Sequence, residues 1–167
     1  MSTSDEPELP GRLDLGEFKN LIRILDPEAA TGIREHVIED FVNTSHPNFQ
    51  ERIGLRRDFA DGSCYTGYLW DYMRNASPVA EEQLWRLLSE LDTVFVLWDI
   101  HSSERIRIPN YWKFSKDAVL KCAPAVLRAG AHLLPEDIYV TNEDRSWLAI
   151  FTHEEVNGQR WCLLSER

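Results

Sequence analysis

The most hydrophobic run of the chain covers residues 93–100 and reads Thr-Val-Phe-Val-Leu-Trp-Asp-Ile. It is short, it is rich in β-branched and aromatic residues, and the polar residues 101–104 follow it at once. These features are typical of a strand that is buried on both faces. We therefore expect this run to be the central strand of a sheet, around which the rest of the chain is organised.

Helical patterns lie on both sides of this run. Asp14 and Glu17 have the spacing of a capping box, and Asp26-Pro27 offers a second helix start with proline in the first turn. Ser77-Pro78 precedes a stripe of leucines, and Ser115 precedes a pattern in which Pro124 should kink the helix. The sequence predicts helices over residues 14–25, 26–41, 77–91 and 115–130, with a short helix within 64–73.

Strand patterns dominate the C-terminal part. Residues 105–108 alternate as an amphipathic strand should, which predicts a hairpin with the central run. Asn157-Gly158 is a strong signal for a type I′ turn between two further strands. Adding strands over 137–140, 147–151 and 159–164, we predict an α+β fold with a mostly antiparallel sheet of about five strands and helices packed on one face. We expect residues 13–167 to form one domain and residues 1–12 to be a flexible tail.

The chain is acidic, with a net charge of -10 over 167 residues. Binding to a phosphate backbone needs clustered Lys and Arg, so this charge argues against nucleic acid as a direct ligand. An acidic surface attracts a basic protein partner over a distance, although acidity can also serve solubility alone. The excess lies in the terminal segments, because residues 1–45 carry ten acids against four bases and residues 131–167 carry seven against three.

Three cysteines, Cys64, Cys122 and Cys162, lie far apart in the chain. Their odd number and spacing fit reduced thiols better than a disulfide framework. The first residues are acidic and polar, and no apolar run approaches about 18 residues. We expect a cytoplasmic protein that does not bind a membrane.

Asp99 and His101 form the most suggestive chemical group, because a carboxylate and an imidazole two residues apart at a strand end can share one side. They could build an acid–base pair or half a metal site, or they could belong to an ordinary turn with a solvated histidine. His153 is followed by two glutamates but lacks the second histidine of a zinc helix. We assign no catalytic residue, no metal ligand and no cofactor.

Acidic pairs and aromatic residues recur elsewhere. The acidic pairs are Glu39-Asp40, Glu136-Asp137, Glu143-Asp144 and Glu154-Glu155. They could be solubilising charges, or a surface that plugs a basic active site, with Tyr111-Trp112 and the aromatics of 70–72 as central anchors. Arg52, Arg56 and Arg57 could bind an anion, but solvation or pairing with Asp58 and Asp61 explains them more simply.

Several phrases carry a resemblance to a known class of proteins. They are residues 95–103 (FVLWDIHSS), 108–112 (IPNYW) and 134–140 (LPEDIYV), with Trp147 and the Thr-His-Glu of 152–154. Over roughly its C-terminal half the chain resembles small acidic bacterial immunity proteins of polymorphic-toxin and contact-dependent inhibition systems. The resemblance implies a protein that neutralises a cognate toxin domain by occluding its basic active site.

The leading hypothesis is therefore a non-enzymatic protein that binds a basic protein partner, itself a monomer or a weak homodimer. One alternative is a small enzyme or ligand-binding protein with a sheet-end site around Asp99, His101 and His153. Another is a scaffold that dimerises through its aromatic surface. The candidate partner-binding residues are Asp99, His101, Tyr111, Trp112, Glu136, Asp137, Glu143, Asp144, Glu154 and Glu155.

Overall fold

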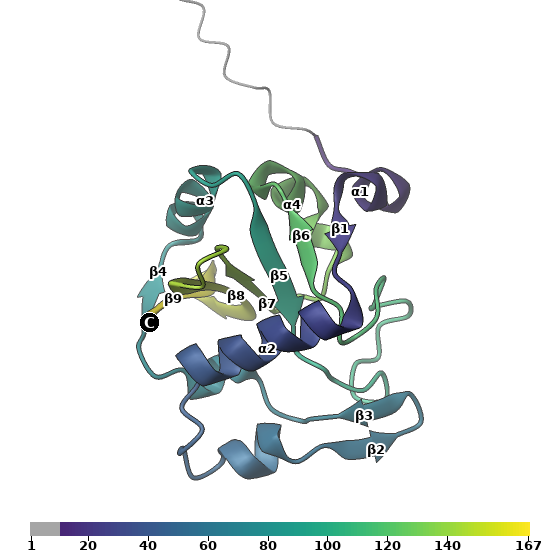
Figure 1. Ribbon diagram of the computed structural model, residues 1–167, viewed down its shortest axis with the longest axis vertical. Helices are drawn as coiled ribbons and strands as arrows, with labels where there is room; N and C mark the ends of the chain where they lie inside the picture. Colours follow the sequence, from purple (N-terminus) through teal and green to yellow (C-terminus); the bar gives the residue numbers. More distant parts are fainter. Residues whose placement is uncertain (1–10) are drawn as a thin grey trace, which may run out of the picture.

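A seven-stranded sheet in the order β1-β6-β5-β7-β8-β9-β4 forms the centre of the computed structural model, which describes residues 11–167 (Figure 1). All neighbouring strands are antiparallel. The predicted α+β class with a mostly antiparallel sheet is confirmed, but the sheet has seven strands rather than about five. The strands are β1 (Arg23–Ile24), β4 (Ala76–Val79), β5 (Val94–Trp98), β6 (Leu120–Cys122), β7 (Ile138–Thr141), β8 (Trp147–Val156) and β9 (Gln159–Glu166).

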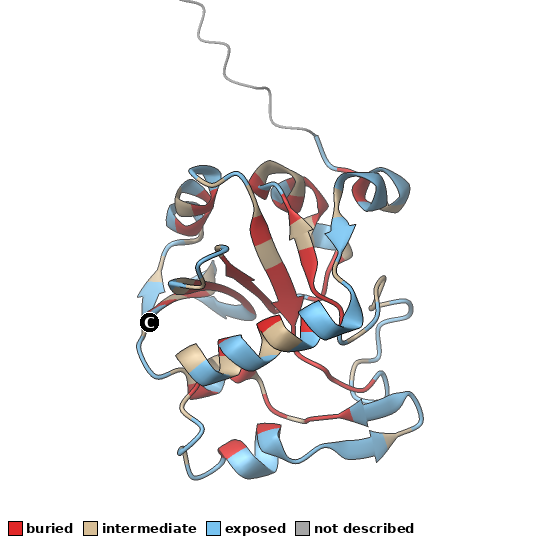
Figure 2. Ribbon diagram, in the orientation of Figure 1, coloured by how far each residue is buried: buried red, intermediate tan, exposed pale blue. Residues whose placement is uncertain are grey.

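The predicted central strand is β5, which lies inside the sheet between β6 and β7. Val94, Val96 and Trp98 are fully buried on one face, and Leu97 is fully buried on the other (Figure 2). Burial on both faces is confirmed. Residues 1–10 of the expected flexible tail lie outside the described residues, and within residues 11–167 no helix is long and apolar enough to cross a membrane.

Helices cover both faces of the sheet, so the prediction of helices on one face was wrong. One face carries α1 (Leu15–Leu21), α3 (Glu81–Ser89) and α4 (Pro124–Gly130), and the other carries α2 (Pro27–Phe41), which crosses in front of the sheet in Figure 1. The reason is visible in β8, where Ala149 and Phe151 enter one core and Leu148 and Ile150 enter the other. A sheet that is apolar on both faces needs helices packed on each face to bury its side chains.

Two prolines mark helix or strand boundaries that the sequence analysis misplaced. Pro124 begins α4 instead of kinking a longer helix, since proline at the first helical position loses no hydrogen bond. Residues 120–122 form β6 because Leu120 and Cys122 pair with β5. Pro78 lies in the edge strand β4, where its missing N–H is tolerated, and α3 begins only at Glu81.

Other local predictions have mixed outcomes. The helix over 26–41 is confirmed, and so is the turn at Asn157-Gly158, where both residues have positive φ (54° and 75°) as type I′ requires. The first helix ends at Leu21, before β1, and residues 105–108 form no strand. The segment between α2 and α3 contains a π-helical turn (Gln50–Gly54), the hairpin of β2 (Arg57–Phe59) and β3 (Gly62–Cys64), and a 3-10 turn (Leu69–Tyr72).

One half-buried side chain of α2, that of Arg34, fixes the long loop between β5 and β6. The Arg34 guanidinium donates hydrogen bonds to the carbonyl oxygens of Trp98, Lys116, Asp117 and Ala118, at 2.7–3.0 Å. Its burial lowers the pKa of Arg34, while the charges of Tyr65, Asp99 and Asp117 oppose that effect. Both ends of the loop are therefore anchored to α2.

Candidate functional site

Three residues from separate strands meet at one end of the sheet. Asp99 follows β5, Asp137 precedes β7, and His153 lies in β8. Trp98 pairs with Ile138, and Ile138 pairs with Phe151, so Asp99 and Asp137 are the next residues outward and His153 lies two residues beyond Phe151 at the same end. The ladder between β8 and β9 is irregular between Phe151 and Glu155, which is where His153 lies.

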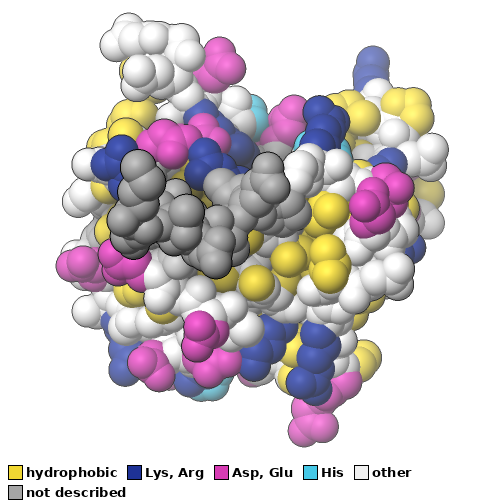
Figure 3. Space-filling view, turned by 90° about the horizontal axis from the view of Figure 1, so that it is seen from above, with side chains coloured by type: hydrophobic (Ala, Val, Ile, Leu, Met, Phe, Trp, Pro, Cys, Tyr) yellow, Lys and Arg dark blue, Asp and Glu magenta, His cyan; other side chains and the backbone are white. Residues whose placement is uncertain are grey.

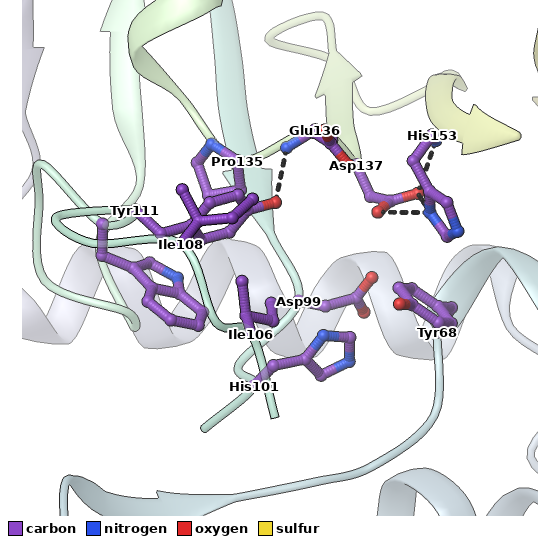
Figure 4. A pocket seen from close by; sticks show the side chains of 11 residues that line it. Tyr68, Asp99, His101, Ile106, Ile108, Tyr111, Pro135, Glu136, Asp137 and His153 are labelled. Atoms are coloured by element: carbon purple, nitrogen blue, oxygen red, sulfur yellow. Dashed lines mark hydrogen bonds and ion pairs between the residues drawn. The ribbon is translucent and has the colours of Figure 1, made fainter. Parts of the chain in front are cut away.

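A pocket of about 100 Å³ opens at this end of the sheet (Figure 4). Figure 4 shows Tyr68 beside Asp99, with the Asp137 and His153 pair and the ring of His101 nearby. The loop between β5 and β6 supplies the apolar wall. The lining residues are Tyr68, Asp99, His101, Ile106, Ile108, Tyr111, Trp112, Pro135, Glu136, Asp137 and His153.

Asp99 is the most buried acid of the site, with 4% of its surface exposed. Its carboxylate accepts hydrogen bonds from Tyr65 Oη (2.8 Å), Tyr139 Oη (2.7 Å) and the backbone N–H of Leu69 (3.0 Å). Burial raises the pKa of Asp99, although the charge of His101 and these three donors oppose the rise. A carboxylate has about four acceptor positions, so one position stays open.

His101 is buried, not solvated as the turn interpretation would have it. Its Nε2 lies 2.6 Å from the carbonyl oxygen of Gly67, and a carbonyl can only accept, so Nε2 carries the proton. The edges and faces of Tyr65 and Tyr68 pack around the imidazole ring at centroid distances of 5.7 and 4.7 Å. His101 is thus held in one orientation at the pocket wall.

Asp137 and His153 form a second acid–imidazole group. Asp137 is 7% exposed, and it accepts hydrogen bonds from His153 Nδ1 (2.9 Å), from the His153 backbone N–H (3.0 Å) and from Trp70 Nε1 (3.0 Å). Burial of His153 lowers its pKa, but the hydrogen bond and charge of Asp137, with the charges of Glu154 and Glu136, outweigh burial and raise it. His153 Nε2 lies 3.3 Å from Glu154 Oε1.

The predicted aromatic pair is half-buried in the pocket wall. Tyr111 Oη accepts a hydrogen bond from the Glu136 backbone N–H at 2.8 Å, and burial raises the pKa of Tyr111 to about 12. The Tyr111 hydroxyl keeps its own proton to donate. Trp112 stacks under the ammonium of Lys116 at 4.4 Å, and the Trp112 indole nitrogen is buried with no hydrogen-bond partner among residues 11–167.

Six of the predicted partner-binding residues line this one pocket: Asp99, His101, Tyr111, Trp112, Glu136 and Asp137. Glu155 lies next to it, in a broader hollow of about 600 Å³ that shares Pro135, Glu136 and His153 with the pocket and also holds Glu81 and Arg160. Glu154 contacts His153 from the outside.

Glu143 and Asp144 are not brought to the pocket. They lie in the turn after β7, at the other end of that strand. Glu143 pairs with Lys121 at 2.8 Å, and its side chain is 59% exposed. The structure therefore divides the predicted residues into a group at the pocket and a group at the opposite end of the sheet.

Other predicted groups have structural partners of their own. Asp61 pairs with Lys116 and accepts hydrogen bonds from Ser102 and Ser103, so it does not pair with the arginines at 52–57. Arg56 lies over the ring of Tyr65 instead, at 5.6 Å. The contacts of Ser102 agree with the turn role expected of the serines. The contacts of Asp99 and His101 do not agree with the turn interpretation.

The three cysteines are free and buried. Burial raises the pKa of Cys122 to about 12 and that of Cys162 to about 11, which disfavours their reactive thiolates. Among residues 11–167, no three His, Cys, Asp or Glu side chains are placed to hold a metal ion together.

No sequence pattern indicated the tyrosines that build the site. Tyr65 and Tyr139 hold Asp99, and Tyr68 lines the pocket beside it. The dense aromatic cluster of residues 65–72 was the signal that could have found two of them, but it was interpreted as a short helix. Tyr139 lies inside a strand pattern, where an aromatic residue has no distinguishing mark.

Comparisons of the chain with protein-family models, with curated proteins and with solved structures found no match. The resemblance to immunity proteins stays a prediction.

Proposed function

We propose that this protein binds a basic protein partner through the pocket end of the sheet, without catalysing a reaction on it. The observation that carries the proposal is the convergence of acidic and aromatic residues on one pocket that no Lys or Arg lines. Aromatic anchors within an acidic rim are the composition expected of an interface for a cationic partner. In the manner of an immunity protein, binding would occlude the partner's basic active site.

Exposed acids around the pocket support the proposal. Glu136, Glu154 and Glu155 are exposed at this end of the sheet, next to the buried Asp137. Arg160 in the neighbouring hollow offsets one of these charges, and the excess is negative. A surface with an excess of one charge attracts an oppositely charged partner over about a Debye length, which raises the association rate and makes it depend on salt. By contrast, the face seen from above in Figure 3 mixes Asp and Glu with Lys and Arg outside the area covered by the undescribed residues.

A second candidate function is the binding or turnover of a small molecule. His153, with its raised pKa next to Asp137, could move a proton near neutral pH at the wall of this pocket. Among residues 11–167, no Ser, Cys, Thr or Lys lines the pocket, so a nucleophile from this part of the chain would have to be a carboxylate, an imidazole or a tyrosine. A bound partner is the proposal that accounts for the exposed acids as well.

A pull-down from native cell lysate at low and high salt tests the proposal. The bait is the full chain, compared with Glu136→Gln/Glu154→Gln/Glu155→Gln and with the control Glu143→Gln/Asp144→Asn at the opposite end of the sheet. We expect one basic protein at near-stoichiometric yield, lost with the triple variant and at high salt and retained by the control. The purified partner's own activity should then fall when the protein is added.

Two results would contradict the proposal. An eluate without a basic protein would favour the small-molecule candidate. Equal loss of the partner in the triple variant and in the control would place the interface elsewhere. Sizing chromatography across concentration, run on the same samples, tests the expectation of a monomer or weak homodimer.

A further inference from the structure

We infer that the pocket takes a single arginine side chain of the basic partner, with the guanidinium placed against the carboxylates of Asp99 and Asp137 and beside the ring of Tyr68. The inference rests on the proposed function and narrows it to one contact.

The polar groups of the pocket favour a ligand that donates hydrogen bonds. Asp99 keeps an open acceptor position on Oδ2, which has one donor, Tyr139 Oη. Asp137 Oδ2 is approached only by His153 Nδ1 among the hydrogen bonds of the described residues. Glu136 also lines the pocket, and the two imidazoles are those of His101 and His153. An anionic ligand would meet the two buried carboxylates of Asp99 and Asp137 and is disfavoured by repulsion.

The walls of the pocket suit a flat cation. Tyr68, Tyr111 and Trp112 offer aromatic surface, and Ile106 and Ile108 offer an apolar wall for an alkyl chain. A guanidinium stacks on aromatic rings and pairs with carboxylates through a planar fork of donors, whereas an ammonium is compact and more strongly hydrated. These properties favour arginine over lysine in a narrow, half-apolar pocket.

The size of the pocket limits the ligand. About 100 Å³ is below the usual range of small-molecule sites, so the pocket accepts one side chain rather than a folded segment. The main chain of the partner would then remain outside, near Glu136 and the neighbouring hollow. One inserted cationic anchor inside an acidic rim is a common arrangement of an interface hot spot.

The test uses two small probes and the full-length protein. Nα-acetyl-arginine amide carries the guanidinium without terminal charges, and Nα-acetyl-citrulline amide has the same shape but no charge. Binding is followed by the indole N–H signals in ¹H–¹⁵N spectra, because Trp70 Nε1 donates to Asp137 and Trp112 lines the pocket. The signals are assigned with Trp70→Phe and Trp112→Phe.

We expect both indole signals to shift with the arginine probe, with a dissociation constant of roughly millimolar order for so small a ligand. The citrulline probe should leave them unchanged, and Nα-acetyl-lysine amide should bind more weakly. Asp137→Asn should weaken the affinity for the arginine probe about tenfold, and Tyr68→Leu should weaken it about threefold. Glu143→Gln, at the opposite end of the sheet, should not change its affinity, and thermal unfolding checks that each variant is folded.

The outcomes separate this inference from the proposed function. If a basic partner binds but the arginine probe shifts neither indole signal, the pocket is not an arginine subsite and the interface proposal stands. Equal shifts with arginine and citrulline would also overturn the inference, because charge would then play no part. If the arginine probe binds as expected while no basic protein is recovered, the pocket binds guanidinium compounds and the proposed protein partner is wrong.

Discussion

Two acidic pairs flank the same strand, β7, but only the pair before the strand contributes a buried carboxylate. Glu136-Asp137 precedes the strand and Glu143-Asp144 follows it. Asp137 is buried and accepts hydrogen bonds from Trp70 and His153, whereas Glu143 is exposed and pairs with Lys121 at the surface. As sequence patterns the two pairs are alike.

The two acidic pairs differ because different segments of the chain cross the two ends of the sheet. The segment before α3 brings Tyr65, Tyr68 and Trp70 over the end where Asp99 and Asp137 lie, and Arg34 anchors the β5–β6 loop beside it. The opposite end carries a short turn at residues 142–146, closed by hydrogen bonds between Asn142 and Ser146. The same residue types therefore serve a pocket at one end and solubility at the other.

Asp99→Ala should have the largest effect on the free energy of unfolding. It tests how far the stability of the pocket end depends on one carboxylate. Tyr65 Oη, Tyr139 Oη and the Leu69 N–H would lose their shared acceptor in a buried place. We expect the free energy of unfolding to fall by about 3 kcal/mol, measured by urea denaturation. Asp99→Asn, which keeps one carbonyl oxygen, should recover part of the loss. A loss no larger than that of a surface substitution would show that the tyrosines find other acceptors.

Asp137→Asn compares the two acidic pairs directly. The amide keeps one acceptor oxygen for Trp70 or His153 but loses the charge-assisted bond to the imidazole. We expect the free energy of unfolding to fall by about 1–2 kcal/mol at pH 6, by the same urea measurement. The change should be smaller at a second, higher pH above the raised pKa of His153. Equal losses at both pH values would mean that the charge of the pair contributes nothing.

The pH dependence of stability should differ between wild type and His153→Gln. The pKa of His153 is raised in the folded protein above the ordinary value of 6.5. Its stabilising contribution is therefore complete below pH 6.5 and is lost as the pH rises through the folded pKa. We expect the free energy of unfolding of the wild type to exceed that of the variant by less than about 1 kcal/mol at pH 6. This difference should disappear at higher pH. A difference that grew with pH would reverse the assigned direction.

Glu143→Gln should have the smallest effect. The Glu143 carboxylate is exposed, and exposed ion pairs contribute little because solvent and salt screen them. Hydrogen bonds to Lys121 and Thr93 lower the pKa of Glu143, so any effect should appear only above its pKa. Unfolding curves at pH 7 should superimpose on those of wild type within error. A loss as large as that of Asp137→Asn would remove the distinction between the two ends of β7.

Much of the fold could be predicted from local pattern. The β5 run, the helix after Asp26 and the Asn157-Gly158 turn are short-range signals, and each of them is confirmed. The errors occurred where a tertiary contact decides, as at Leu120 and Cys122, which have a helical pattern in sequence but pair with β5. A strand of three residues carries too little periodicity to compete with an apparent helix.

The site was predictable only in pieces. Asp99, His101 and Asp137 were each singled out by their residue type and their place at an element end, but no pattern connects positions 99, 137 and 153. Their meeting depends on the strand order, in which β5 and β8 are both neighbours of β7. Tyr139 and Arg34 carried no signal at all, because a buried tyrosine or arginine is distinguished from a surface one only by its partners.

The sequence by itself determined the α+β class, the buried strand β5 and the acidity of the chain, because these depend on composition and on contacts between near neighbours. The tertiary structure alone decided that helices cover both faces, that Asp137 is buried while Glu143 is exposed, and that Asp99 shares a pocket with His153. The physical reason is that burial and hydrogen-bond partners are set by residues that lie tens of positions away in the chain.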